Sequence, residues 1–154
     1  MTLTGRELLA RLNADRSERR LHLVPCNRGS IDPGEASIDL RLGSHFLLPR
    51  RGRQEQFDPV DQTDPWQFEC ARREGCLHPS MAGMEAAWLP ADGHITLQPR
   101  DFLLAATLEY VGLPADLCAH VMGRSRWARV GLVVEMASFV HPGYRGCLTL
   151  EVQN

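Results

Sequence analysis

The segment 123–132 combines side chains that could bind phosphate. It contains Arg124, Ser125 and Arg129 beside glycine, and we predict one short helical turn near residues 124–129. The free N–H groups of a helix start and the fork of a guanidinium group both suit phosphate oxygens. A single Arg-x-Ser sequence more often makes exposed ion pairs of little energetic value, so this segment does not define a site by itself.

A second chemically interesting residue is Glu151, in the segment 141–154. It lies between Leu150 and Val152, so on a strand its carboxylate would face away from both apolar neighbours. A lone glutamate of this kind usually faces solvent. It becomes a candidate general acid or base if the fold, or a subunit interface, brings it to Ser125 and Arg129.

Several elements must position these residues, and most of them are predicted to be strands. We expect a helix over about residues 5–15, because Thr4 and Glu7 have the spacing of a capping box. Alternating or β-rich runs predict strands at 20–25, 36–43, 94–98, 102–111, 117–122, 132–136 and 147–152. Several short strands with one terminal helix indicate a mainly β barrel or sandwich.

Within the run 36–43 the side chains alternate in character. Ile38, Leu40 and Leu42 are predicted to face one side, and Ser37, Asp39 and Arg41 the other. Residues 49–93 show little periodicity, and we treat them as a variable excursion with room for two short strands.

Composition excludes several classes of function. The chain has 154 residues, 44% of them hydrophobic, and a net charge of −2, so we expect one domain and no attraction to nucleic acid or membranes. All 17 basic residues are arginine, which excludes a Schiff-base lysine and a P-loop lysine. The sequence shows no signal peptide and no apolar stretch long enough to span a membrane, so we expect a cytoplasmic protein. Its 5 scattered cysteines fit reduced thiols better than a set of disulfides.

A metal site is not expected. Cys70, Cys76 and His78 lie close together in sequence, but they lack a fourth ligand and the usual zinc spacing. The arginines at 50, 51 and 53 fit a solvated loop better than a nucleic-acid contact.

Taken together, the motifs resemble those of the dCTP deaminases. The opening Leu-Thr-Gly-Arg-Glu-Leu at 3–8, the run at 36–43, Leu-Pro-Ala-Asp-Leu at 113–117 with the segment 123–132, and the segment 141–154 occur in that family's order. The resemblance covers residues 3–48 and 94–154. It implies a dUTPase-like distorted β-barrel or jelly-roll, and a homotrimer with sites between subunits.

The related dUTPases share this fold and the Arg-Ser motif. They generally carry an apolar residue where this chain has Glu151, and a catalytic Asp where it has His141. Both differences favour the deaminase branch.

The resemblance also implies residue roles. Glu151 would be the general acid/base, Arg129 its electrostatic support, and Ser125 a ligand of the attacking water or of the phosphates. The implied substrate-binding residues are Arg124, Ser125, Ser138, His141 and Tyr144. The substrate would be dCTP or a related deoxynucleotide that carries its own Mg²⁺. Zinc is not implied, since the H-x-E and P-C-x-x-C signatures of zinc deaminases are missing.

The chain departs from the family pattern at three places. The family usually has Asp at the position of His141, the loop 131–142 is one residue shorter, and the chain stops at Asn154 where the family continues into a tail. We therefore expect residues 1–154 to form a single domain without that tail. Deamination of dCTP to dUTP and ammonia is the leading hypothesis. A dUTP pyrophosphatase, a bifunctional deaminase-diphosphatase and a non-catalytic nucleotide sensor remain alternatives.

Overall fold

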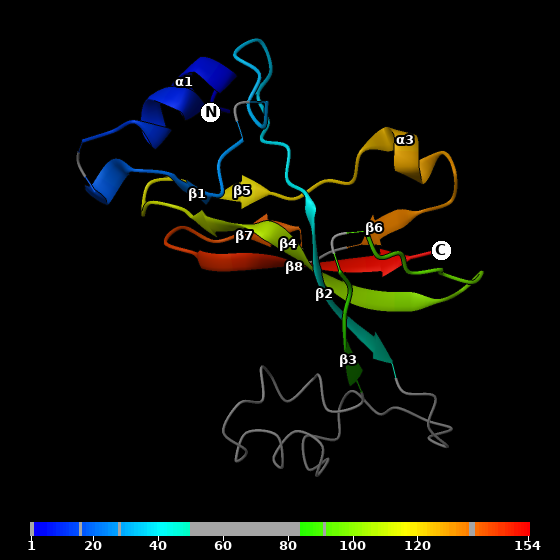
Figure 1. Cartoon of the computed structure of the whole chain (residues 1–154). Coiled ribbons are helices and arrows are strands. Elements are labelled where there is room, and N and C mark those ends of the chain that lie inside the picture. The colour runs from blue at the N-terminus through cyan, green and yellow to red at the C-terminus, as the bar shows by residue number, and fades with distance from the viewer. Residues whose placement is uncertain (1, 16, 28, 50–83, 91, 136–137) are drawn as a thin grey trace, which may run out of the picture.

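A computed structural model describes residues 2–15, 17–27, 29–49, 84–90, 92–135 and 138–154 of the chain (Figure 1). Its helical elements are α1 (Gly5–Leu12), a 3₁₀ turn η1 (Ser17–Arg19) and α3 (Ser125–Ala128). Its strands are β1 (His22–Val24), β2 (Leu42–Pro49), β3 (Met84–Trp88), β4 (Phe102–Gly112), β5 (Ala119–His120), β6 (Val133–Glu135), β7 (Phe139–Val140) and β8 (Arg145–Gln153). The predicted mainly β fold with an N-terminal helix is confirmed.

One antiparallel sheet organises the chain, with strand order β3-β2-β4-β8-β6. The long strand β4 is at its centre: β8 pairs along one side of it, while β2 and β1 pair with different stretches of the other side. A smaller sheet, β5-β7, lies beside β1 (Figure 1). This arrangement brings β8, with Glu151, beside β6, the strand that follows α3.

Two groups of buried side chains form the core of the fold. The first joins β1, β7 and the ends of β4 and β8, and consists of Leu21, Leu23, Val111, Leu113, Val140 and Leu148. The second lies at the other end of the large sheet and consists of Phe46, Leu103, Ala105 and Val152. We call them the first and second core clusters.

Helix α1 begins as the sequence predicts. Thr4 and Glu7 form the capping box, with the Thr4 backbone N–H donating to Glu7 Oε2 at 2.7 Å. The helix ends at Leu12, before the predicted end near residue 15. Its side chains Leu8 and Leu12 pack against the first core cluster. Gly5 is buried, because the turn at Asp32 passes directly against it.

The predicted strand over 36–43 is wrong except at its end, where β2 starts at Leu42. The backbone donors of this segment bind other partners: the Asp39 N–H donates to Ser30 O at 2.7 Å, and the Arg41 N–H donates to the Glu109 carboxylate. The predicted alternation holds for Ile38 and Leu40, which pack on the first core cluster, and is wrong for Leu42, which is 53% exposed where β2 begins.

The predicted strand over 94–98 is also absent. Ile95 and Leu97 pack on the second core cluster, but the Leu97 carbonyl accepts a hydrogen bond from the Asn154 side chain rather than from a strand. The remaining predicted strands correspond to β1, β4, β5, β6 and β8, whereas β7 was not predicted. In the 49–93 excursion, β3 lies within the described residues and 50–83 lie outside them.

No helix within the described ranges has the length and apolar character that crossing a membrane requires.

Candidate functional site

A polar cavity of about 330 Å³ lies where the 35–39 loop meets the start of α3. Its lining residues are all polar or charged: Glu35, Ser37, Asp39, Arg124, Ser125 and Arg126. The cavity thus joins two of the segments that the sequence singled out. Arg124 and Ser125, predicted to bind phosphate, both line it.

Arg124 is paired with Asp39 across this cavity. Its Nε donates to Asp39 Oδ1 at 3.1 Å, and its Nη2 donates to Asp39 Oδ2. The two side chains are about half exposed, at 49% and 45%. The hydrogen bond to Asp39 and the Asp39 charge, assisted by the Glu35 charge, raise the pKa of Arg124 above its ordinary value. Arg124 is therefore a permanent cation.

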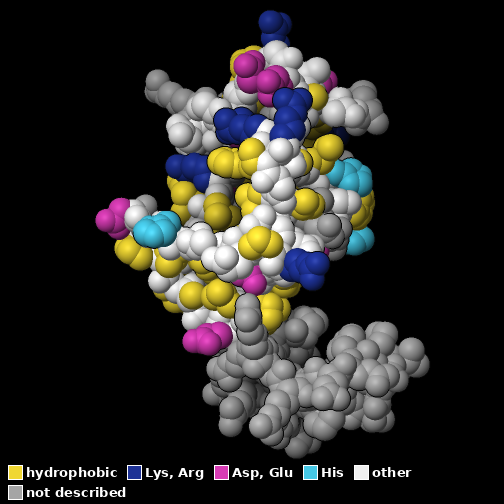
Figure 2. Space-filling model, turned by 90° about the vertical axis from the view of Figure 1, so that its right-hand side faces the viewer, with side chains coloured by type: hydrophobic (Ala, Val, Ile, Leu, Met, Phe, Trp, Pro, Cys, Tyr) yellow, Lys and Arg dark blue, Asp and Glu magenta, His cyan; other side chains and the backbone are white. Residues whose placement is uncertain are grey.

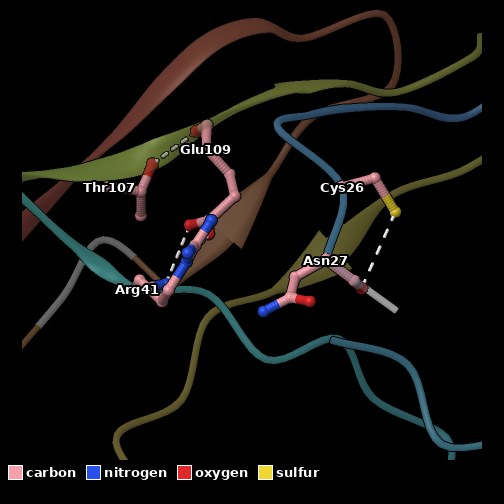
Figure 3. A network of polar contacts seen from close by, with 5 residues as sticks. All are labelled: Cys26, Asn27, Arg41, Thr107 and Glu109. Carbon is pink, nitrogen blue, oxygen red and sulfur yellow. Dashed lines mark hydrogen bonds and ion pairs between the residues drawn. The ribbon is translucent and has the colours of Figure 1, made fainter. Parts of the chain in front are cut away.

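The loop that carries Asp39 is anchored to the sheet by a buried carboxylate (Figure 3). Glu109 of β4 is fully buried, and it accepts hydrogen bonds from the Arg41 backbone N–H at 2.8 Å and from Arg41 Nε at 2.6 Å. The Thr107 hydroxyl donates to the Glu109 carbonyl at 2.8 Å and accepts from the Leu148 N–H at 2.9 Å. The two buried polar side chains of β4, Thr107 and Glu109, thus both have hydrogen-bond partners.

Sequence reasoning missed Glu109. Its signal was available: in the strand 102–111 it occupies the same alternating face as Leu103, Ala105 and Thr107, all of which are buried. A buried carboxylate usually has a cationic partner, and the chain has no lysine, which made an arginine the first candidate.

The short helix α3 places Ser125 and Arg129 at opposite ends. Arg124 is the extended N-cap residue, and the Arg129 N–H closes the turn by donating to Ser125 O at 3.0 Å. Gly131 then adopts a φ of 92°, a left-handed conformation that suits glycine and turns the chain into β6. The Arg129 side chain is exposed and forms no ion pair with any residue that the structure describes.

Glu151 lies on β8, with Leu150 and Val152 directed to the second core cluster on the opposite face. It is partly buried and lies opposite Leu104 of β4 and Glu135 of β6 in the strand register. Among the described residues, none makes a hydrogen bond or an ion pair with its carboxylate. This orientation agrees with the sequence prediction.

Ser138, His141 and Tyr144 cluster around the small sheet. The Ser138 carbonyl accepts from the Val121 N–H at 2.9 Å, and the His141 ring makes an edge contact with Phe139 at 4.8 Å between centroids. The Tyr144 hydroxyl donates to the Cys147 carbonyl at 2.7 Å. Burial raises the pKa of the Tyr144 phenol, so this donor keeps its proton at neutral pH.

The structure therefore brings together part of the predicted site. Arg124 and Ser125 share the polar cavity with Asp39, whereas Glu151, Arg129, Ser138, His141 and Tyr144 are not among its lining residues. The chain does place α3 near the strand of Glu151, because a side chain at Gly123 would contact Val134 of β6, and β6 pairs with β8.

In the described part of the chain, no group of three or more His, Cys, Asp or Glu residues is arranged to hold a metal ion. Cys70, Cys76 and His78, considered above as a metal site, lie outside the described residues.

The fold defines the class of protein, a mainly β chain of the dUTPase-like kind. A crystal structure of 2′-deoxycytidine 5′-triphosphate deaminase from Agrobacterium tumefaciens superimposes with a TM-score of 0.63 at 20% identity, covering 98% of this chain and 41% of that one. The family model described as dCTP deaminase-like matches residues 2–154. The chain belongs to the dCTP deaminase-like family.

Proteins related to the chain in sequence are named either "dCTP deaminase, dUMP-forming" or "dCTP deaminase". The chain is 32% identical over 155 residues to a "dCTP deaminase, dUMP-forming" of Nanoarchaeum equitans, covering 100% of this chain and 74% of the relative. For the Methanobrevibacter smithii protein of the same name, the identity is 34% over 120 residues, covering 77% of this chain and 54% of the relative. A "dCTP deaminase" of Haloarcula marismortui is 33% identical over 160 residues, covering 100% and 70%. The chain thus spans about half to three quarters of the length of these relatives.

Proposed function

We propose that the chain catalyses the hydrolytic deamination of dCTP, in which water replaces the C4 amino group to give dUTP and ammonia. The observation that carries the proposal is the environment of Glu151. Glu151 is partly buried, its side chain lies on the face of β8 opposite the second core cluster, and no described residue makes a hydrogen bond or an ion pair with its carboxylate. Such a carboxylate is available to handle a proton. Membership of the dCTP deaminase-like family supports the choice of substrate.

In this proposal Glu151 acts as general acid and base. It takes a proton from water as the oxygen attacks C4, and delivers that proton to N3 of the ring. It then moves the second proton of the water to the amino group, which leaves as ammonia. Arg129 has no ion-pair partner among the described residues, so its guanidinium group is available to orient Glu151 and to stabilise the tetrahedral intermediate.

Arg124 and Ser125 would bind the triphosphate in the polar cavity that they line. Ser138, His141 and Tyr144 would contact the base and sugar from the region of the small sheet. We propose that Mg²⁺ arrives with the nucleotide and that no zinc takes part. A strong zinc chelator is then expected to leave ammonia release unchanged while Mg²⁺ is in excess, and loss of activity that added zinc restores would contradict this.

We also propose that the chain assembles as a homotrimer with sites between subunits. Support comes from large apolar side chains left exposed around α3 and β6: Met122 (83%), Trp127 (48%), Val130 (72%) and Val133 (41%). Figure 2 views the side of the molecule that carries α3 and shows hydrophobic side chains gathered across the middle of that face. Exposed apolar patches of this kind often mark protein interfaces. Sedimentation equilibrium tests the assembly, and a monomer at all concentrations contradicts it.

The deciding experiment compares the purified chain with its Glu151→Gln variant. Both are incubated with dCTP and Mg²⁺, and ammonia is measured together with nucleotide affinity. We expect ammonia release to disappear in the variant while dCTP binds nearly as well, because glutamine keeps the shape of glutamate without its proton transfer. Equal turnover in the two proteins would rule out the role of Glu151.

A bifunctional reaction is a second candidate, favoured by the words "dUMP-forming" in the names of several relatives. It consumes two waters: dCTP gives dUMP, pyrophosphate and ammonia. Measuring pyrophosphate beside ammonia separates the possibilities. Both products indicate the bifunctional enzyme, and pyrophosphate from dUTP alone indicates a pyrophosphatase. Neither product, with dCTP or dUTP still bound, indicates a non-catalytic sensor.

A further inference from the structure

We infer that Asp39 is a positioning residue for phosphate recognition: it holds the Arg124 guanidinium by one edge and presents the other edge to the polyphosphate of the substrate. The inference rests on the proposed function for the identity of the substrate. It adds Asp39, a carboxylate that would otherwise be expected to repel an anionic ligand.

The Asp39–Arg124 pair leaves one edge of the guanidinium group free. Asp39 binds Arg124 side-on, through Nε and Nη2. A guanidinium group has five N–H donors in a fixed plane, so a side-on carboxylate leaves the Nη1 edge free. Among the described residues, none accepts a hydrogen bond from Arg124 Nη1. A phosphate can therefore bind Arg124 without displacing Asp39.

Asp39 is itself held in place. Its backbone N–H donates to Ser30 O at 2.7 Å. Two residues later, Arg41 is fixed to the fully buried Glu109 by two hydrogen bonds. The neighbours Ile38 and Leu40 pack on the first core cluster. An arginine bound to a fixed carboxylate loses less rotamer freedom when the ligand arrives, which strengthens binding.

The opposite role for Asp39 is to compete with the phosphate for the Arg124 guanidinium group. The cavity contains the carboxylates of Glu35 and Asp39 beside the cations Arg124 and Arg126. If Asp39 merely neutralised Arg124, its removal would tighten the binding of any polyanion. The two roles therefore predict changes of opposite sign for one substitution.

The test measures the affinity of inorganic tripolyphosphate for the full chain by titration calorimetry. Asp39→Asn is expected to weaken binding about tenfold, the equivalent of one charge-assisted hydrogen bond. The matched control is Asp116→Asn, which removes an aspartate from another exposed Arg–Asp pair, that of Arg11, away from the cavity. The control is expected to bind tripolyphosphate like the wild type.

A double-mutant cycle separates positioning from a general structural effect. In an Arg124→Ala background, Asp39→Asn is expected to have no further effect on tripolyphosphate affinity, because Asp39 acts through Arg124. Equal losses in both backgrounds, or tighter binding by Asp39→Asn, would overturn the inference. If Asp39→Asn does not fold, Asp39→Ser serves in the same cycle.

Turnover of dCTP gives a second readout. Asp39→Asn is expected to raise KM about tenfold and to change kcat less than twofold, since phosphate binding and not chemistry is affected. A wild-type chain that binds tripolyphosphate but releases no ammonia from dCTP contradicts the proposed function alone. A wild-type chain that does not bind tripolyphosphate contradicts the positioning role itself.

Discussion

The Glu109 carboxylate, fully buried in β4, accepts hydrogen bonds from both the backbone N–H and the Nε of Arg41. This pair connects the centre of the large sheet to the loop that carries Asp39, two residues before Arg41. The placement of a cavity residue therefore depends on a buried charge in a strand. Because Arg41 remains 47% exposed, solvent partly screens one member of the pair while the other has no access to water.

Replacing Arg41 by alanine is expected to destabilise the fold by about 3 kcal/mol, because it leaves a buried carboxylate with a single backbone donor. The value lies at the low end for broken buried pairs, since Arg41 is half exposed. Urea unfolding measures the change. A double variant, Arg41→Ala with Glu109→Gln, is expected to lose at least about 1 kcal/mol less than the sum of the single losses. Additive losses would show that the two side chains do not stabilise the fold as a pair.

Much of the fold could be predicted from the sequence where local patterns decide the structure. The capping box of Thr4 and Glu7 fixed the start of α1, and alternation identified β4 and β8. The pattern at 36–43 was right that Ile38 and Leu40 are inward, and wrong about Leu42, which is exposed, and about the strand. Side-chain alternation reports burial, whereas a strand also requires a neighbouring backbone, which the sequence does not show.

The candidate site was predictable in part for the same reason. Arg124 and Ser125 were identified from their residue types, and they line the polar cavity. Asp39, the partner of Arg124, lies 85 positions away from it in sequence, and Glu109 lies 68 positions from Arg41. Contacts at such separations follow from the sheet topology, so no local pattern could pair these residues.

Gly5→Ala is expected to destabilise the chain by about 2 kcal/mol, although alanine normally favours a helix. A methyl group at Gly5 would overlap the Asp32 carbonyl oxygen and come within 2.9 Å of Pro33 Cα. Helix α1 would have to move away from the 32–35 turn. The control is Gly29→Ala, where the added methyl group meets nothing within 4 Å. Thermal unfolding of the two variants should differ, and equal melting temperatures would contradict the close packing of α1.

Asp116 is expected to contribute stability that depends on pH. The Arg11 guanidinium, which donates to Asp116 Oδ2 at 2.6 Å, lowers the pKa of this carboxyl below its ordinary value near 3.8. A carboxyl with a lowered pKa in the folded state stabilises the fold above its ordinary pKa and loses that effect as the pH falls through the folded value.

Asp116→Asn should therefore lower the melting temperature at neutral pH, and its effect should diminish as the pH falls below the ordinary carboxyl pKa near 3.8. Asp92→Asn is the control, since Asp92 is exposed and forms no ion pair with the described residues. Melting curves across the acid range provide the comparison. A constant difference between Asp116→Asn and wild type at every pH would show that the ion pair with Arg11 is not the cause.

Arg129→Ala is expected to lower kcat for ammonia release about 100-fold or more, with a smaller change in KM, because its proposed partner is the charge that develops during the reaction. Arg129→Lys should recover only part of the loss, since lysine keeps the charge without the planar fork of donors. The control is Arg6→Ala, an exposed arginine of α1. Steady-state kinetics with dCTP measure all three variants. A fall in kcat of less than about tenfold for Arg129→Ala would place Arg129 outside the transition-state contacts and leave Glu151 to act without it.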